Sequence, residues 1–83
     1  MRNLDLLTLR LFAAVCDQRS IARVAEQESI VGSAISKRLA QLENAVGTPL
    51  LVRKRRGVVP TPAGETLLDH ARTMLASAGP IAR

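Results

Sequence analysis

The 83-residue sequence predicts a mainly α-helical domain, in which three helices, a small β-hairpin and a longer fourth helix follow one another. Two observations support this fold class. Apolar residues recur at helical spacing in four segments, and two short β-prone runs stand between the third and the fourth. The composition agrees, because 47% of the residues are hydrophobic but Phe12 is the only aromatic one. A core of Leu, Ile, Val and Ala favours packed helices over a β-sandwich.

The first two helices are predicted over residues 4–19 and from residue 21 to just before Ser29. In the first, an apolar stripe recurs at three- and four-residue steps and consists of Leu4, Leu7, Leu11, Phe12 and Val15. Cys16, at the end of this stripe, is expected to be a small core residue. Ser20 is the predicted N-cap of the short second helix, and a tight connection over residues 27–30 follows it.

The third helix is predicted over residues 31–46, because Gly47 is a natural C-terminal residue and Pro49 prevents continuation. Its predicted core stripe lies within roughly 60° of arc and comprises Ile35, Leu39, Leu42 and Val46. The opposite side forms a strip without acidic residues, which we call the polar strip: Ser33, Ser36, Lys37, Ala40, Gln41 and Asn44. Arg38 and Glu43 are expected on its flanks.

A two-stranded hairpin is predicted from residues 50–52 and 58–59, joined by a basic turn over residues 53–57 in which Gly57 supplies a positive φ. Thr61 then resembles an N-cap followed by Pro62 in the first turn, and Gly79-Pro80 marks a stop. The fourth helix is therefore predicted over residues 62–78. Its apolar side, expected to pair in part with a second chain, carries Leu67, Leu68, Ala71, Leu75 and Ala78. The alternative is that this helix folds back onto its own domain.

The excess positive charge is confined to residues 37–56. Six basic residues there face only Glu43, and this difference of five equals the formal net charge of +5. The basic residues are Lys37, Arg38, Arg53, Lys54, Arg55 and Arg56. Elsewhere, acidic and basic residues cancel. One surface is therefore expected to carry a focused positive field, as in nucleic-acid-binding domains.

The order of these elements predicts a helix-turn-helix unit whose third helix enters the major groove of a DNA duplex. Ser33, Ser36 and Lys37 are the expected groove contacts, because short hydroxyl side chains let the backbone approach base edges and a cation can reach guanine or phosphate. The basic hairpin is expected to lie on the backbone or in the minor groove. Single-stranded targets are disfavoured, since base stacking needs aromatic side chains.

Three other interpretations compete with duplex binding. An ordinary three-helix bundle would also have a solvated polar face. A helical interaction module could use its basic patch on an acidic protein or an anionic membrane surface, although a membrane binder needs bulky apolar residues beside its charges. An enzyme is not expected, because His70 and Cys16 are the only residues of their types. We expect no cofactor, no metal and no transmembrane span, and the single cysteine suits a reducing cytoplasm.

Motifs along nearly the whole chain resemble the N-terminal DNA-binding domain of the LysR-type transcriptional regulators. They are residues 20–26 (SIARVAE), 33–39 (SAISKRL), 42–43 (LE), Gly47, 49–53 (PLLVR) and 61–64 (TPAG). The resemblance implies a winged helix-turn-helix domain over residues 1–60 and a linker and dimerisation helix over residues 61–83. It also implies a homodimer on a palindromic site, and an effector that acts only through a C-terminal domain missing from this sequence, which we therefore expect to be a fragment.

The resemblance also implies which residues contact DNA. Groove contacts fall on Gly32, Ser33, Ser36, Lys37 and Arg38, phosphate contacts near Thr61 and Pro62, and the basic hairpin serves as the wing. Three positions depart from the family pattern: Glu28 replaces a leucine, Val31 a capping serine and Gly32 a glutamine. Val31 cannot cap and Gly32 has no side chain to read a base, so readout is expected to rest more on Ser33, Ser36 and Lys37. Gln41 is expected to be a further DNA contact. Glu28 is expected at the surface, paired with an arginine.

Overall fold

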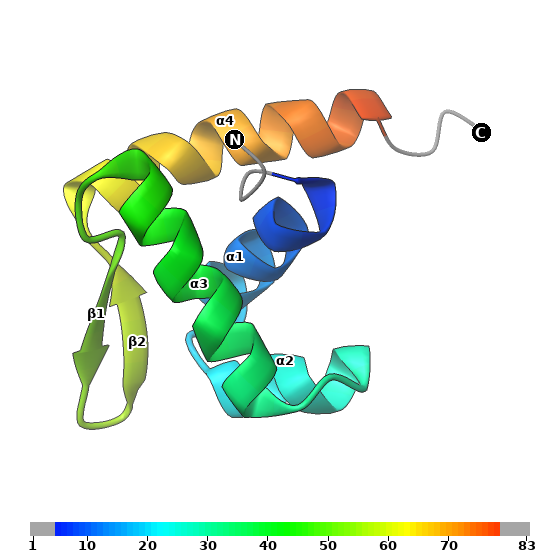
Figure 1. Ribbon diagram of the computed structural model, residues 1–83, viewed down its shortest axis with the longest axis vertical. Helices are drawn as coiled ribbons and strands as arrows, with labels where there is room; N and C mark the ends of the chain where they lie inside the picture. Colours follow the sequence, from blue (N-terminus) through cyan, green and yellow to red (C-terminus); the bar gives the residue numbers. More distant parts are fainter. Residues whose placement is uncertain (1–4, 79–83) are drawn as a thin grey trace.

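The computed structural model describes residues 5–78, and these form four helices and one hairpin in the predicted order. The elements are α1 (Leu6–Gln18), α2 (Ile21–Glu28), α3 (Gly32–Val46), β1 (Leu51–Lys54), β2 (Gly57–Pro60) and α4 (Pro62–Ala78). Leu4 and the predicted stop at Gly79-Pro80 lie outside the described residues. In Figure 1, α4 runs across one end of the molecule, and α2 and the turn of the hairpin lie toward the other.

The core lies where α1, α2 and α3 pack together, and the hairpin and α4 complete it. Phe12 and Leu11 of α1, Val24 of α2, and Ile35 and Leu42 of α3 are fully buried. Cys16 is buried as predicted. Val46 is not part of the core, contrary to the sequence prediction, because 42% of its surface is exposed. It is the last residue of α3, and the helix ends there at Gly47 (φ 88°).

Side-chain caps fix the starts of α1 and α2. The Asp5 carboxylate accepts a hydrogen bond from the Thr8 N–H at 2.8 Å, and the Ser20 hydroxyl accepts one from the Arg23 N–H at 3.1 Å. Ser20 is thus the N-cap that the sequence predicted. Helix α2 ends at Glu28, and its C-cap Ser29 has the left-handed conformation (φ 56°). The turn before α3 therefore covers residues 29–31 and not the predicted 27–30.

The hairpin is longer and its turn tighter than predicted. Strand β1 pairs antiparallel with β2 from Leu51 opposite Pro60 to Lys54 opposite Gly57, so only Arg55 and Arg56 form the turn. The prediction that residues 53–57 are a loop was wrong for Arg53 and Lys54, which belong to β1, and for Gly57, which belongs to β2. Long basic side chains are compatible with this strand, because their charged ends remain exposed to solvent.

Helix α4 begins at the predicted Thr61 cap, whose hydroxyl accepts a hydrogen bond from the Gly64 N–H at 3.0 Å. It packs along α1, where Arg72 forms an ion pair with Asp17. Leu68 and Ala71 are buried against the rest of the chain. Their predicted part in a dimer interface does not fit this packing, because neither side chain is accessible to a second chain. Leu67 and Leu75 are half-buried.

Candidate nucleic-acid interface

The polar strip of α3 faces solvent. Ser36 is half-buried, and its other members are exposed: Ser33, Lys37, Ala40, Gln41 and Asn44. The opposite side of the same helix holds Ile35, Leu39 and Leu42 in the core, so burial fixes the rotation of α3 about its axis. A helix anchored in this way presents the same row of side chains outward along its length.

The hairpin stands beside this strip. Arg53 is directly opposite Val58, so both side chains lie on one face of the hairpin, and Val58 is buried in the core. Arg53 also shares a shallow hollow with Ser36 and Ala40 of α3. In Figure 1 the turn of the hairpin and the N-terminal end of α3 point toward the same end of the molecule. The polar strip and the basic hairpin therefore adjoin each other at Ser36, Ala40 and Arg53.

Glu43 fixes the hairpin to α3. Its Oε2 accepts hydrogen bonds from the backbone N–H groups of Leu50, at 2.7 Å, and Leu51, at 3.1 Å. The only acid of the basic stretch thus holds the start of β1 against the C-terminal half of α3. Sequence reasoning placed Glu43 on the flank of α3 but missed this role. The sequence did hold a signal for this role, since Glu43 is the single acid among six basic residues. An acid there weakens the positive field, which indicates that it has a structural purpose.

Thr61 has a structural position in this network. Its hydroxyl donates to the Pro49 carbonyl at 2.8 Å while accepting from Gly64, and its N–H donates to the Leu50 carbonyl at 3.0 Å. These contacts join the start of α4 to the segment before β1. Pro62 is exposed beside it. The Thr61 hydroxyl, predicted to lie near a phosphate, thus already donates and accepts within the chain.

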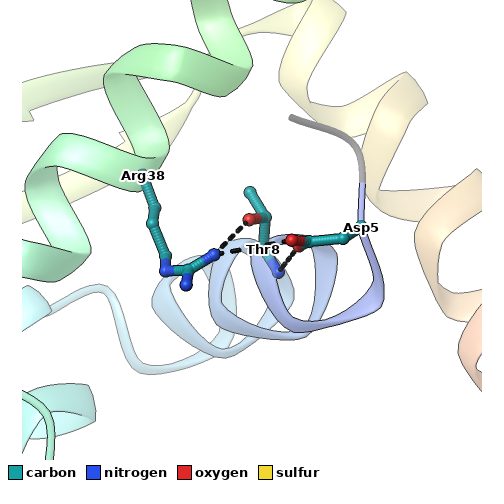
Figure 2. Close-up of polar contacts among 3 residues, drawn as sticks. All are labelled: Asp5, Thr8 and Arg38. Carbon is teal, nitrogen blue, oxygen red and sulfur yellow. Dashed lines mark hydrogen bonds and ion pairs between the residues drawn. The ribbon is translucent and has the colours of Figure 1, made fainter. Parts of the chain in front are cut away.

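Arg38 points toward the start of α1 (Figure 2). Its Nη1 donates to the Thr8 hydroxyl at 3.1 Å and lies 3.6 Å from the Asp5 Oδ2. Hydrogen bonding from the backbone and the side chain of Thr8, and then the Arg38 charge, lowers the pKa of the Asp5 carboxyl below its ordinary value. Arg38 thus joins α3 to the N-terminal end of α1, which separates it from the other predicted DNA-contacting cations.

The remaining cations of the hairpin, Lys54, Arg55 and Arg56, are exposed at and beside the turn. Glu28 is half-buried and its Oε1 accepts a hydrogen bond from Arg10 at 2.8 Å, which confirms the predicted pairing with an arginine. Val31, directly before α3, makes no side-chain cap, also as predicted, and Gly32 begins the helix.

The described residues contain no group of three or more His, Cys, Asp or Glu side chains that could hold a metal ion. Burial, together with the nearby Asp17 carboxylate, raises the pKa of the Cys16 thiol to about 11, so this thiol stays protonated at neutral pH. Among residues 5–78, no helix has the length and apolar character needed to cross a membrane.

Comparisons with known proteins agree with this geometry. The family model of the bacterial regulatory helix-turn-helix proteins of the lysR family matches residues 6–65. The nitrogen assimilation regulatory protein nac of Klebsiella aerogenes is 40% identical over 72 residues, which cover 87% of this chain and 24% of that protein. The probable HTH-type transcriptional regulator LtrA of Klebsiella pneumoniae is 43% identical over 77 residues, covering 92% of this chain and 25% of LtrA. The chain thus spans about a quarter of the length of these relatives.

Solved structures show the same fold. The DNA-binding domain of BenM, in complex with catB site 1 DNA, matches with a TM-score of 0.85 and 31% identity over 89% of this chain and 82% of that one. Full-length CbnR, complexed with its target DNA, matches with a TM-score of 0.86 and 32% identity over 92% of this chain and 26% of CbnR. The predicted winged helix-turn-helix fold is confirmed by these matches. With its family model matched over most of its length, this chain belongs to the lysR family of bacterial regulatory helix-turn-helix proteins, which are regulators and not enzymes.

Proposed function

We propose that this chain binds double-stranded DNA sequence-specifically, as the DNA-binding part of a transcriptional regulator. The observation that carries the proposal is the continuity of the polar strip with the basic hairpin, through the hollow shared by Ser36, Ala40 and Arg53. A convex helix flanked by a cationic wing can place one element in the major groove while the other follows the phosphate backbone.

The roles divide along this surface. Ser33, Ser36, Lys37 and Gln41 carry the sequence readout in the major groove, because they lie on the exposed side of α3. Arg53, Lys54, Arg55 and Arg56 neutralise phosphates or enter the minor groove, which adds affinity without base specificity. Arg38 supports the position of α3 through Thr8 and Asp5. The DNA complexes of BenM and CbnR, whose folds this chain shares, support duplex binding by this fold.

Dimerisation through α4 is the second part of the proposal. Leu67 is half-buried and Met74, seven residues further on, is 42% exposed. Residues seven apart lie on nearly the same line along a helix, so these two side chains leave an apolar row that a second copy of α4 can cover. Leu75 borders the row, and Ala78 is the last residue of α4. Met74 was missing from the set predicted from sequence.

The proposal also covers the domain organisation of the chain, its oligomeric state, its effector and its cellular compartment. It treats residues 1–60 as the DNA-binding unit and residues 61–83 as the linker helix. A homodimer on a palindromic site, a small-molecule effector bound only through a further C-terminal domain, and action in the bacterial cytoplasm complete it. Because the chain spans a quarter of its relatives' length, an effector response is testable only in a longer protein.

Binding is tested by selecting duplexes from a random pool and titrating the selected duplex, a scrambled duplex and anionic vesicles at two salt concentrations. We expect preference for the selected duplex and an affinity that falls with salt. Lys37→Ala is expected to cost about 1–3 kcal/mol and to relax the preference at one base position. Arg72→Ala, an equal loss of charge on α4, is the matched control and should bind nearly as the parent does. Binding to vesicles but not to any duplex would contradict the proposal.

A further inference from the structure

Val31 is an unusual residue for its position. It is the N-cap of α3, where Ser, Thr, Asn or Asp is preferred because a side-chain oxygen can accept a hydrogen bond from the first turn. Valine offers no such oxygen, and the helix begins without a side-chain cap. The residue does not serve the core either, because 70% of its surface is exposed, more than for any other large hydrophobic residue of the part described.

The surroundings leave this side chain open at the tip of α3. Gly32 follows it without a side chain, and a Cβ at that residue would meet nothing within 4 Å outside its chain neighbours and the helix backbone. Ser33, the next residue, is exposed and begins the polar strip. The N-cap and the first residues of α3 therefore present an isopropyl group, then a residue without a side chain, then the Ser33 hydroxyl.

We propose that Val31 contacts the C5-methyl group of a thymine in the major groove and so determines specificity at that base pair. The inference rests on the proposed function. In a helix-turn-helix, the N-terminal residues of the second helix reach the base edges. The thymine methyl is the apolar group that unmodified bases present in the major groove, and apolar side chains recognise it. A valine cannot bond to a phosphate as a capping hydroxyl can, whereas it fits a methyl group.

Deoxyuridine provides the test, because it keeps the pairing and the O4 acceptor of thymidine and lacks only the methyl group. Each thymidine of the selected duplex is replaced in turn, and affinity is measured for the parent chain. We expect one thymidine per half-site to show a loss of about fourfold, equivalent to burial of one methyl-sized group at about 0.8 kcal/mol. Replacements elsewhere should have little effect.

Variants then assign the contact. Val31→Ala and Val31→Ser should both abolish the penalty at that thymidine, and Val31→Ser should also raise Tm by supplying a cap. Val46→Ala changes an exposed valine at the other end of the same helix and should keep the penalty. The inference is overturned if no thymidine is sensitive to loss of its methyl group, or if the penalty survives in Val31→Ala. If the parent chain binds no duplex at all, the proposed function fails together with this inference. If it binds the selected duplex but shows no Val31-dependent penalty, only this inference fails.

Discussion

Two glycines with opposite constraints show how single residues affect the positions of α3 and the hairpin. Gly57, at the start of β2, has a φ of 132°, and a Cβ there would overlap the Arg19 carbonyl oxygen. That oxygen accepts a hydrogen bond from the Val58 N–H at 3.2 Å. The C-cap of α1 therefore contacts the start of β2 directly. Gly32 has helical geometry and open space around it. The first glycine is required by the fold, while the second is tolerated by it.

Alanine substitutions should therefore have effects of opposite sign. Gly57→Ala should destabilise the chain, by roughly 1–3 kcal/mol for the strained backbone alone, because both the φ angle and the contact with Arg19 oppose a side chain. Gly32→Ala should stabilise it by up to about 1 kcal/mol, since alanine loses less entropy in a helix. Urea unfolding of the two variants measures both changes. Equal destabilisation by both variants would contradict this assignment.

Some contacts of single residues were predictable from local sequence and others were not. The caps at Ser20 and Thr61, the pairing of Glu28 and the exposure of the polar strip were predicted, because each depends on local spacing or on the cost of burying a charge. The tether from Arg38 to Thr8 and Asp5 joins residues about thirty positions apart. No local pattern encodes such a contact, because it depends on the crossing of α3 and α1.

At the scale of elements, the decisive contact is the one between α3 and the hairpin through Glu43. Glu43→Ala leaves the Leu50 and Leu51 N–H groups without this acceptor. The free energy of unfolding should fall by about 1–3 kcal/mol. Duplex affinity should fall too, although the net charge becomes more positive by one, because the wing loses its fixed position beside the polar strip.

Glu26→Ala is the matched control, since it removes the same charge from an exposed position on α2. It should leave stability nearly unchanged and should not weaken duplex binding. Both variants are measured by chemical unfolding and by duplex titration at one salt concentration. The comparison separates the effect of the position of the hairpin from the effect of the lost negative charge. If Glu43→Ala binds the duplex more tightly than the parent chain, the net charge and not the position of the hairpin determines its contribution to affinity, and the prediction is contradicted.

The exposed apolar row on α4, Leu67 and Met74, is the surface through which we propose that two chains dimerise. Met74→Glu should shift the sedimentation profile toward monomer at concentrations where the parent chain dimerises, because a charge in an apolar interface is costly to bury. Ala76→Glu, on an exposed position of the same helix, should leave the profile unchanged. A parent chain that remains monomeric at high concentration would contradict dimerisation at this chain length.

The elements themselves were largely predictable. All four helices were predicted within a few residues, because apolar periodicity and the caps at Ser20, Gly47 and Thr61 reflect local chemistry. The turn of the hairpin was predicted too long, because a run of basic residues is typical of a loop. Where the strands end depends on cross-strand pairing, which continues to Lys54 and Gly57. The packing of α4 on α1 could not be predicted from the sequence, because an apolar stripe does not show which of its residues contact α1.

For the whole molecule, the distribution of charge becomes a surface only through the fold. Residues 37–56 hold the whole net charge of +5, but the sequence leaves open whether Lys37 and the hairpin lie on one side. Packing of Val58 into the core and the Glu43 hydrogen bonds hold the hairpin beside the part of α3 that carries Ser36 and Ala40. A two-fold dimer would then place two such surfaces about one helical turn, ~34 Å, apart or at a multiple of it.

The central claim is that α3 and the hairpin contact the same stretch of duplex. Ser33→Cys and Arg55→Cys, each in a Cys16→Ala background, are coupled to a DNA-cleaving iron chelate, with Ala76→Cys on α4 as the control. We predict cleavage of the selected duplex by both probes within one helical turn in each half-site, and none by the control. Cleavage by only one of the two probes, or at sites more than a turn apart, would contradict the claim.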